Sequence, residues 1–563
     1  MALEQHPRLQ ADVVGGRRGE REWAEGGSRD GGGEEAREGS AQDGGGGTRQ
    51  SGGERHVDSC GSGTGPWVAA STRDPGEKLR RPQVRARRGP TAAIVRSRCQ
   101  RPSEPEIRRR APGARPRPRP IVEVHVPVVR PFRALRYSSE VATDLAAVVA
   151  PPYDVIRPDE HHRLLARDPR NVVRLDLPTA EPGDLDPDDR YRRAARHLGA
   201  WRGDGTLRRD PRPTISILED AYHLPGRDEP HVRRGFFARV RLEPFGAGIR
   251  AHERTMTGPK EDRYKLLRAT GVNTSPVVAM YEDRSGRAAA LLDEVVATQP
   301  AVELTDEAGV RHRLWTAVEG DGTVAEELCG IASASTLTIA DGHHRYETAL
   351  RYARERRAGM ADGVDLDTDD VLMLLVEPVA GTIDVLPTHR VVLGLGEAGL
   401  TELEAGLSRC FDVQAGVSAE GLLGSFGPLG KAAGGAGRFG LWTRHGGSIL
   451  DARREALAPH LPAGGAALRR LDVSLLGAAL DALVGIDAAA IAEGDRIRYT
   501  MDAAEAIALV DGGTDGADAA FLLEPTPAAE IVAVAADGDV MPQKSTYIYP
   551  KALTGLVINP LEG

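Results

Sequence analysis

Aromatic residues are scarce in this chain: Phe, Trp and Tyr make up 4% of its 563 residues. Its hydrophobic cores must therefore be built mainly from Leu, Val, Ile and Ala. Cysteine is scarcer still, and no two cysteines form a C-x-x-C pair: they stand at Cys60, Cys99, Cys329 and Cys410. This spacing argues against a disulfide framework and against a cysteine zinc site, and it suits a reducing cytoplasm.

Long apolar runs are also missing. No stretch approaches the roughly 20 apolar residues of a membrane helix, and the first residues contain no apolar signal-peptide core. We therefore expect a cytoplasmic protein without a membrane partner. At 563 residues the chain is too long for one compact domain, so two or more folded units are expected.

Lysine is nearly absent from residues 1–120, which contain one Lys beside 23 Arg, 16 acidic residues and 21 Gly. This segment has no apolar periodicity and cannot bury enough surface to offset its ordering entropy, so we predict a disordered tail. A basic arm for nucleic acid and a start codon assigned too far upstream remain alternatives. The rest of the chain carries a net charge of −17, which argues against nucleic-acid binding by the folded body.

Beyond the tail, apolar residues recur with the periods of both strands and helices, which predicts a mixed α/β fold. We divide it into an α/β domain at 121–390 and a C-terminal α/β subdomain at 391–563, which returns to the site through residues 541–551. The predicted strands are 121–126, 214–218, 235–242, 335–340, 371–376, 521–523 and 531–534. The predicted helices are 190–201 and 471–484, the second with Asp472 as its N-cap.

The turn Asp341-Gly-His-His-Arg345 is the strongest candidate for a functional site. It follows a predicted strand and precedes residues with helical apolar spacing, so unpaired backbone N–H groups and the positive end of a helix dipole meet there. Gly342 permits close approach of a ligand, and Arg345 can hold a phosphate through two parallel hydrogen bonds. We interpret the turn as an anion cradle. Asp341 as a plain helix cap is the structural alternative, and adjacent His343 and His344 are poorly spaced for zinc.

Two further segments carry chemistry-bearing residues. Glu253 is suited to a general base or a magnesium ligand, and Lys260 and Arg263 to neutralising phosphate charge, although the stretch also fits a solvated charged loop. Near the C-terminus, Lys544 lies in a segment rich in Ser, Thr and Tyr. It either closes on a phosphate or belongs to a terminal strand anchored by aromatic residues.

These motifs occur in an order that resembles the bacterial and archaeal family known as domain of unknown function 1015, over about residues 129–560. The motifs are Pro131-Phe-Arg-Ala-Leu135, Ala150-Pro-Pro-Tyr-Asp154, His252-Glu253 with Thr255, Ile339-Ala-Asp-Gly-His-His-Arg-Tyr-Glu347, Leu386-Pro-Thr-His-Arg390 and Met541-Pro-Gln-Lys-Ser-Thr-Tyr547. The Asp-Gly-His-His-Arg turn is similar to the nucleotide-binding turn of the ParB and sulfiredoxin-like superfamily, which includes free serine kinases. The resemblance implies a ParB/sulfiredoxin-like core that binds a nucleotide phosphate between Gly342 and Arg345.

On this basis we expect a kinase-like phosphotransferase that uses ATP or ADP (CTP is possible) with Mg²⁺ on a small hydroxylated metabolite such as a serine-like compound. Glu253, Asp341, His343 and His344 are the expected catalytic residues, and Asp341 and Glu253 the expected metal ligands. Gly342, His344, Arg345, Lys260, Arg263 and Lys544 are expected to bind the nucleotide. The alternative is a ParB-like nucleotide-gated binding protein without turnover. The sequence indicates no oligomeric state.

Overall fold

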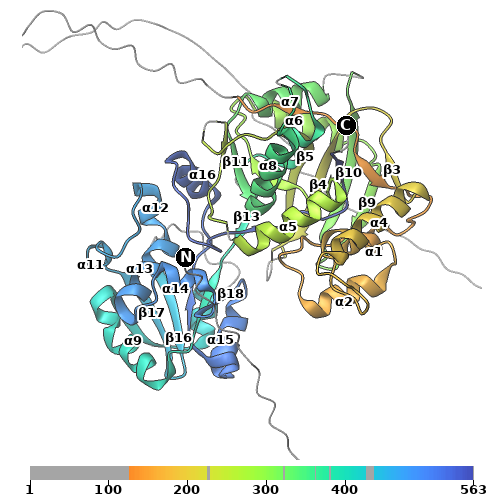
Figure 1. Cartoon of the computed structure of the whole chain (residues 1–563). Helices are drawn as coiled ribbons and strands as arrows, with labels where there is room; N and C mark the ends of the chain where they lie inside the picture. The colour runs from red at the N-terminus through yellow and green to blue at the C-terminus, as the bar shows by residue number, and fades with distance from the viewer. Residues whose placement is uncertain are drawn as a thin grey trace, which may run out of the picture. The chain divides into compact units, whose positions relative to one another are not determined.

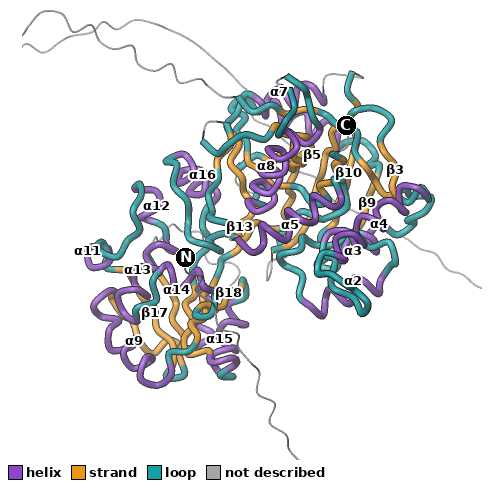
Figure 2. The backbone as a smooth tube through the Cα atoms, viewed as in Figure 1, coloured by secondary structure: helices purple, strands orange, loops and turns teal. Residues whose placement is uncertain are grey.

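The computed structural model describes residues 126–561 except 225–227, 247, 256, 321–323, 362, 380–381 and 427–436. The predicted tail at 1–120 and nearly all of the strand predicted at 121–126 lie outside the described residues. None of the helices in the described ranges is both long and apolar enough to cross a membrane. The predicted mixed α/β class is confirmed: helices and strands alternate along the described chain (Figures 1 and 2).

A mixed sheet of nine strands organises residues 129–376, in the order β6-β11-β8-β12-β5-β4-β10-β9 with β1 beside β5. Its strands are β1 (Val129–Arg130), β4 (Thr214–His223), β5 (Pro230–Arg241), β6 (Ile249–Arg250), β8 (Val277–Met280), β9 (Val302–Thr305), β10 (Arg311–Val318), β11 (Leu337–Asp341) and β12 (Asp370–Val376). Short ladders pair β2 (Leu135–Tyr137) with β3 (Leu207–Arg209) and β7 (Val272–Asn273) with β21 (Asn559–Pro560). The helices of this part are α1 (Leu145–Val148), α2 (Pro158–Arg167), α3 (Val173–Asp176), α4 (Asp189–Gly203), α5 (Thr257–Thr270), α6 (Arg287–Val296), α7 (Val324–Ser333) and α8 (His343–Arg357).

The apolar run predicted as a strand at 371–376 forms β12, which is buried along its whole length. Successive residues of a strand face opposite sides of the sheet. Val371, Met373 and Leu375 join the core formed with α5 to α8, whereas the residues between them join the core on the other face. Because both faces are covered, the strand contains no polar alternation. Figure 1 shows α5 and α8 side by side over the strands, and they contact each other.

A second sheet of six strands occupies residues 389–522, in the order β15-β17-β16-β19-β14-β18. Its strands are β14 (His389–Leu393), β15 (Phe411–Val417), β16 (Arg438–Thr443), β17 (Gly446–Ala452), β18 (Ile497–Thr500) and β19 (Ala517–Leu522). The helices here are α9 (Gly396–Cys410), α10 (Ala419–Phe426), α11 (Arg454–Leu457), α12 (Ala466–Arg470), α13 (Asp472–Val484), α14 (Ala488–Glu493), α15 (Ala503–Asp511) and α16 (Ala528–Ala536).

Two local predictions in this second part are wrong. Residues 531–534 are not a strand but the middle of α16, whose Ile531, Val534 and Ala535 are buried on one side of the helix. Their spacing of three and four residues fits a helix, and the short apolar run hid it. Asp472 does not cap α13 with its side chain; its carboxylate instead accepts a hydrogen bond from the backbone N–H of Gly437, at 2.6 Å.

The C-terminal segment returns to the first sheet. β13 (Asp384–Leu386) pairs with β20 (Tyr547–Tyr549), and the side chain of Arg233 donates a hydrogen bond to the carbonyl of Pro550, at 2.6 Å. Arg233 also pairs with Asp220 at 2.6 Å, and His312 contacts the other oxygen of the same carboxylate at 2.6 Å. All three side chains are almost fully buried. This network fixes the segment that carries Lys544 and Lys551.

Stability is expected to fall as the pH rises from 7 toward 9.5, because of His312. Burial lowers its pKa, but Asp220 and Asp306 outweigh burial and raise the pKa from 6.5 to about 9. A raised folded-state pKa stabilises the fold fully below about pH 6.5, and this contribution is lost as the pH passes 9. The loss should be on the order of 3 kcal/mol in urea unfolding. His312→Gln should remove this pH dependence, whereas the exposed-site variant His445→Gln should keep it; a flat wild-type profile contradicts the prediction.

Candidate functional site

The turn at 341–345 lies where β11 ends and α8 begins, as the sequence predicts. Gly342 is the residue that precedes the helix, and its φ of 91° lies in the left-handed region that favours glycine. A Cβ at this position would also lie 3.1 Å from the guanidinium of Arg345. Glycine is therefore needed here for both conformation and space. Asp341 does not cap the helix, because the cap residue is Gly342 and no side chain caps it.

Asp341 is held between two cations. One carboxylate oxygen contacts Lys551 Nζ at 2.7 Å, and the other contacts Arg345 Nη2 at 2.6 Å. Burial alone would raise the pKa of Asp341, but Lys551 and Arg345 outweigh it and hold the pKa far below its ordinary value. A carboxylate this acidic is a poor proton acceptor. With a cation already on each oxygen, Asp341 is also a poor match for its expected role as a metal ligand.

Arg345 is committed to contacts within the protein. Besides Asp341, its guanidinium donates to the hydroxyl of Ser275 at 2.5 Å and to the carbonyl of Pro276. These bonds tie the start of α8 to the loop before β8. They use three of the five N–H groups of the guanidinium, which leaves two for the parallel hydrogen bonds to phosphate expected from the sequence. Replacing Arg345 would therefore disturb the fold as well as the site.

His252 and His343 form hydrogen bonds within the protein. His252 is fully buried, and its Nδ1–H donates to the carbonyl of Ile339 at 2.6 Å, since a carbonyl can only accept. The backbone N–H of His252 donates to Nε2 of His343 at 3.3 Å. Burial lowers the pKa of His343 well below its ordinary value, so the ring is neutral with its proton on Nδ1. His343 is therefore a hydrogen-bond donor and a poor base. Burial likewise lowers the pKa of His344.

A cavity of about 130 Å³ lies over this turn. The cationic side chains at its wall are Arg254, Arg345, Lys544 and Lys551, and the acidic ones are Asp154, Glu253 and Asp341. In the described ranges no carboxylate pairs with Arg254 or Lys544. The wall therefore carries four cationic and three acidic side chains, and this excess of one positive charge favours an anion.

Glu253 and Lys544 come from distant parts of the sequence and meet at this cavity. Glu253 Oε1 accepts a hydrogen bond from the backbone N–H of Lys544 at 3.1 Å, and Glu253 also bridges to Met541. Lys544 has a φ of 53°, in the left-handed region that residues other than glycine seldom adopt. Burial raises the pKa of Glu253, even though Lys544 and Lys551 lower it. A carboxylate with a raised pKa is a better proton acceptor than an ordinary one.

Two expected phosphate ligands lie elsewhere. Lys260 pairs with Glu347 at 2.8 Å and is absent from the cavity wall. Arg263 is buried against Asp262 and Asp176, and its guanidinium lies 4.2 Å from the centre of the Tyr153 ring. Both lie on α5, a helix whose spacing of apolar residues shows only weakly in the sequence. The segment is a helix rather than the charged loop considered above.

Four residues at the wall, Asp154, Arg254, Gln543 and Lys551, were not expected as site residues from the sequence. Lys551 lies at the end of the segment 541–551 and contacts Asp341, while Arg254 and Gln543 each stand next to a residue that was expected in the site. The sequence signal that could have indicated Arg254 and Gln543 was their position next to Glu253 and Lys544.

For metals, the described residues contain no group of three or more His, Cys, Asp or Glu that could hold an ion. Within the described part of the chain, Asp154 and Glu253 are the carboxylates at the wall without an ion pair to a cation.

Residues 129–474 match the family described as "Protein of unknown function (DUF1015)". The chain belongs to this family. The membership predicted from the six ordered motifs is confirmed, and the match includes the turn, Glu253 and Arg390. No curated protein matches the chain.

Solved structures resemble the chain only weakly. A free serine kinase in complex with AMP is 13% identical with a TM-score of 0.29, covering 55% of this chain and 86% of that one. A conserved hypothetical protein from Pyrococcus furiosus is 14% identical, with a TM-score of 0.28 and coverages of 56% and 92%. SbnI from Staphylococcus aureus, C-terminally truncated, is 13% identical, with a TM-score of 0.28 and coverages of 58% and 87%. At these TM-scores no role of these proteins transfers to this chain.

Proposed function

We propose that this DUF1015 protein binds the phosphates of ATP or ADP in the cavity over Gly342 and transfers a phosphoryl group to the hydroxyl of a small metabolite. The observation that carries the proposal is the meeting of Glu253, a carboxylate with a raised pKa, and Lys544, a cation without an acid partner in the described residues. Phosphoryl transfer needs charge neutralisation and positioning more than covalent chemistry. This cavity supplies both.

Each group has a part in the reaction. Lys544 and Arg254 neutralise phosphate oxygens, and the N–H groups at the start of α8 add hydrogen bonds. Glu253 accepts the proton of the acceptor hydroxyl, whose oxygen then forms a bond to the γ-phosphorus. The bond from that phosphorus to the bridging oxygen breaks, and ADP leaves with the electron pair; with ADP as the donor the β-phosphorus is transferred and AMP leaves. Lys551 and Arg345 hold Asp341, which fixes the turn.

The size of the cavity limits what it holds. Pockets for drug-sized ligands measure about 300–1,000 Å³, so 130 Å³ suits phosphate groups rather than a whole nucleotide. The nucleoside would extend beyond it. Mg²⁺ is usually held by substrate phosphates and one or two carboxylates, and Asp154 is the wall carboxylate available for that role. Mg²⁺ there would neutralise charge on the phosphates.

Nucleotide binding to the full chain tests the proposal. ATP or ADP with Mg²⁺ should raise the melting temperature, because a ligand of the folded state stabilises it. Lys544→Ala should raise the Kd for nucleotide at least about tenfold, because it removes one charge-assisted hydrogen bond worth about 1.5–3 kcal/mol. Lys265→Ala is the matched control: it removes a lysine of α5 that pairs with Asp188, and it should leave the Kd unchanged.

Two results would contradict this proposal. The first is a melting temperature that no nucleotide, CTP included, raises. The second is a Kd that Lys544→Ala and Lys265→Ala leave equal. Binding without transfer of labelled phosphate to any metabolite would leave the nucleotide site in place and exclude the kinase reaction.

A further inference from the structure

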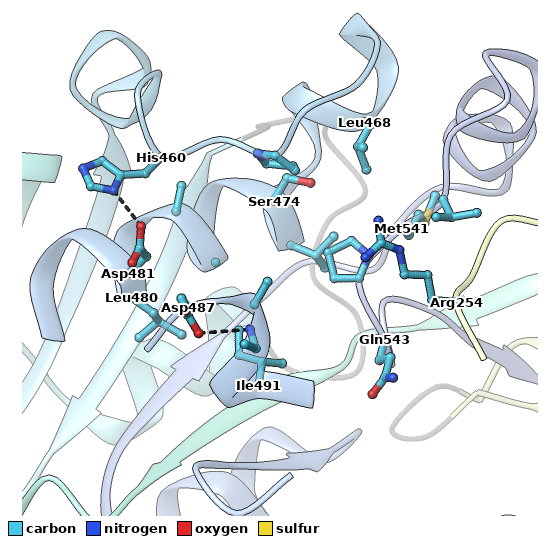
Figure 3. Close-up of a pocket in the computed structure, with 18 of the residues that line it drawn as sticks. Arg254, His460, Leu468, Ser474, Leu480, Asp481, Asp487, Ile491, Met541 and Gln543 are labelled. Atoms are coloured by element: carbon cyan, nitrogen blue, oxygen red, sulfur yellow. Dashed lines mark hydrogen bonds and ion pairs between the residues drawn. The ribbon is translucent and has the colours of Figure 1, made fainter. Parts of the chain in front are cut away.

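A second and larger cavity adjoins the phosphate site. It measures about 760 Å³ and lies among α12, α13, α14 and residues 538–543. Arg254 and Gln543 line both cavities, so the two share a wall. Figure 3 shows Arg254, Met541 and Gln543 at one end of the larger cavity and His460 with Asp481 at the other.

Most of the lining is apolar, and its charged groups are either carboxylates with partners or arginines. The apolar residues include Leu468, Val473, Ala478, Leu480, Ile491 and Met541. The three wall carboxylates all have partners. Asp481 contacts His460 at 2.7 Å, Asp487 accepts from the first N–H groups of α14, and Asp539 accepts from the N–H of Gly465 at 2.6 Å.

Arg390 is the buried cation of this lining, whereas Arg254 is exposed. The side chain of Arg390 is 6% exposed and lines the cavity, with Nη1 donating to the carbonyl of Thr388 at 2.6 Å and its guanidinium 5.6 Å from the centre of the Tyr499 ring. Over the described ranges no carboxylate lies within ion-pair distance of it. Burial lowers the pKa of Arg390 more than Tyr499 and the more distant Asp472 raise it. A buried charge with no counter-ion in direct contact is costly, and proteins pair such groups or bind an ion with them.

We propose that the larger cavity is the acceptor site and that it binds an organic acid with an apolar body, whose carboxylate pairs with Arg390. That this acid is the phosphate acceptor rests on the function proposed above; that the cavity binds an acid does not. In this arrangement the acceptor hydroxyl lies at the end formed by Arg254 and Gln543, where the cavity meets the one containing Glu253.

Size and charge define the acid. The volume of 760 Å³ falls within the range of pockets for drug-sized ligands, so the acceptor is larger than free serine. The lining contains two arginines, Arg254 and Arg390, and three aspartates, so a second negative charge on the ligand is disfavoured. The planar fork of arginine fits both a carboxylate and a phosphate. The carboxylate is favoured because it carries one charge, whereas a phosphate monoester carries nearly two.

The fluorescent acid 8-anilinonaphthalene-1-sulfonate, which combines one negative charge with an apolar body, is a direct probe for the full chain. We expect it to bind, and octanoate to displace it at concentrations at least tenfold lower than octanol or octyl phosphate. Arg390→Met should weaken probe binding at least tenfold, whereas the control Arg284→Met, at a 93% exposed side chain, should not.

Gly477→Leu should also block the probe, because a side chain there would extend into the open space of the cavity. Gly199→Leu, on the exposed face of α4, is its control.

Stability separates a ligand role of Arg390 from a structural one. If Arg390 serves a ligand, Arg390→Met should leave the melting temperature of the ligand-free protein unchanged or raise it, because an unpaired buried charge is removed. A large drop indicates a structural arginine and overturns the proposal. So does probe binding that Arg390→Met and Gly477→Leu both leave intact, or stronger displacement by octyl phosphate than by octanoate.

The two proposals fail separately. If the wild type binds the acid but no nucleotide, the phosphotransferase is refuted and the acid site stands. Nucleotide binding without any acid binding refutes the acid site and keeps the phosphate cradle. Acid that binds beside nucleotide but is never phosphorylated refutes the acceptor assignment.

Discussion

Glu253→Gln is expected to reduce kcat for phosphoryl transfer by about 10²–10⁴-fold, the usual contribution of a general base. Glutamine keeps the shape of the side chain and can still accept the hydrogen bond from the backbone N–H of Lys544, but it cannot take a proton. Nucleotide affinity should therefore change little, and the melting temperature should be preserved. Transfer of labelled phosphate, measured with saturating nucleotide and acceptor, gives kcat directly.

The pH profile provides an independent reading of the same residue. Burial raises the pKa of Glu253 above its ordinary value, and a base works only when deprotonated. In the wild type kcat should rise with pH through this elevated pKa, and the rising limb should vanish in Glu253→Gln. Glu261→Gln, at an exposed residue of α5 that pairs with Arg351, is the matched control. Equal kcat values in the two variants would remove Glu253 from the reaction.

Asp341→Ala is expected to lower the free energy of unfolding by about 3–5 kcal/mol, the typical result of removing one partner from a buried charge network. The side chains of Lys551 and Arg345 are 13% and 12% exposed, and both would lose their counter-charge. The start of α8 and the C-terminal segment would then repel each other across the site. Denaturant unfolding near pH 7 measures the loss, and Asp159→Asn, which breaks an exposed pair on α2, should change it little.

Acid and added anions should both reduce the difference in stability between the wild type and Asp341→Ala. The pKa of Asp341 in the folded state is lowered, so its contribution is complete above the unfolded pKa of about 4 and is lost as the pH falls below that value. In Asp341→Ala the two freed cations form a stronger anion site, and sulfate or phosphate should restore part of the lost stability. A variant as stable as the wild type, or one that sulfate does not stabilise, contradicts the network described here.

The sequence by itself determined the mixed α/β class, the family and the position of the central turn. Strand β12 is a continuous run of apolar residues, and Gly342 stands between a strand and a helical apolar pattern, so local physics alone predicts both. The Lys551 contact could not be predicted in this way. It joins residues 210 positions apart, which come together through tertiary contacts of the C-terminal segment with β13, Arg233 and Glu253.

The tertiary structure decided which of the expected phosphate ligands have partners within the protein. Arg345, the expected phosphate ligand, has its guanidinium bound to Asp341, Ser275 and Pro276, whereas Lys544 keeps its charge without an acid partner in the described residues. Lys260 and Arg263 have ion-pair partners away from the cavity wall. The type of a residue shows which bonds it can form. Whether it still has bonds to offer depends on neighbours from distant parts of the chain, because burial requires each charge to find a partner.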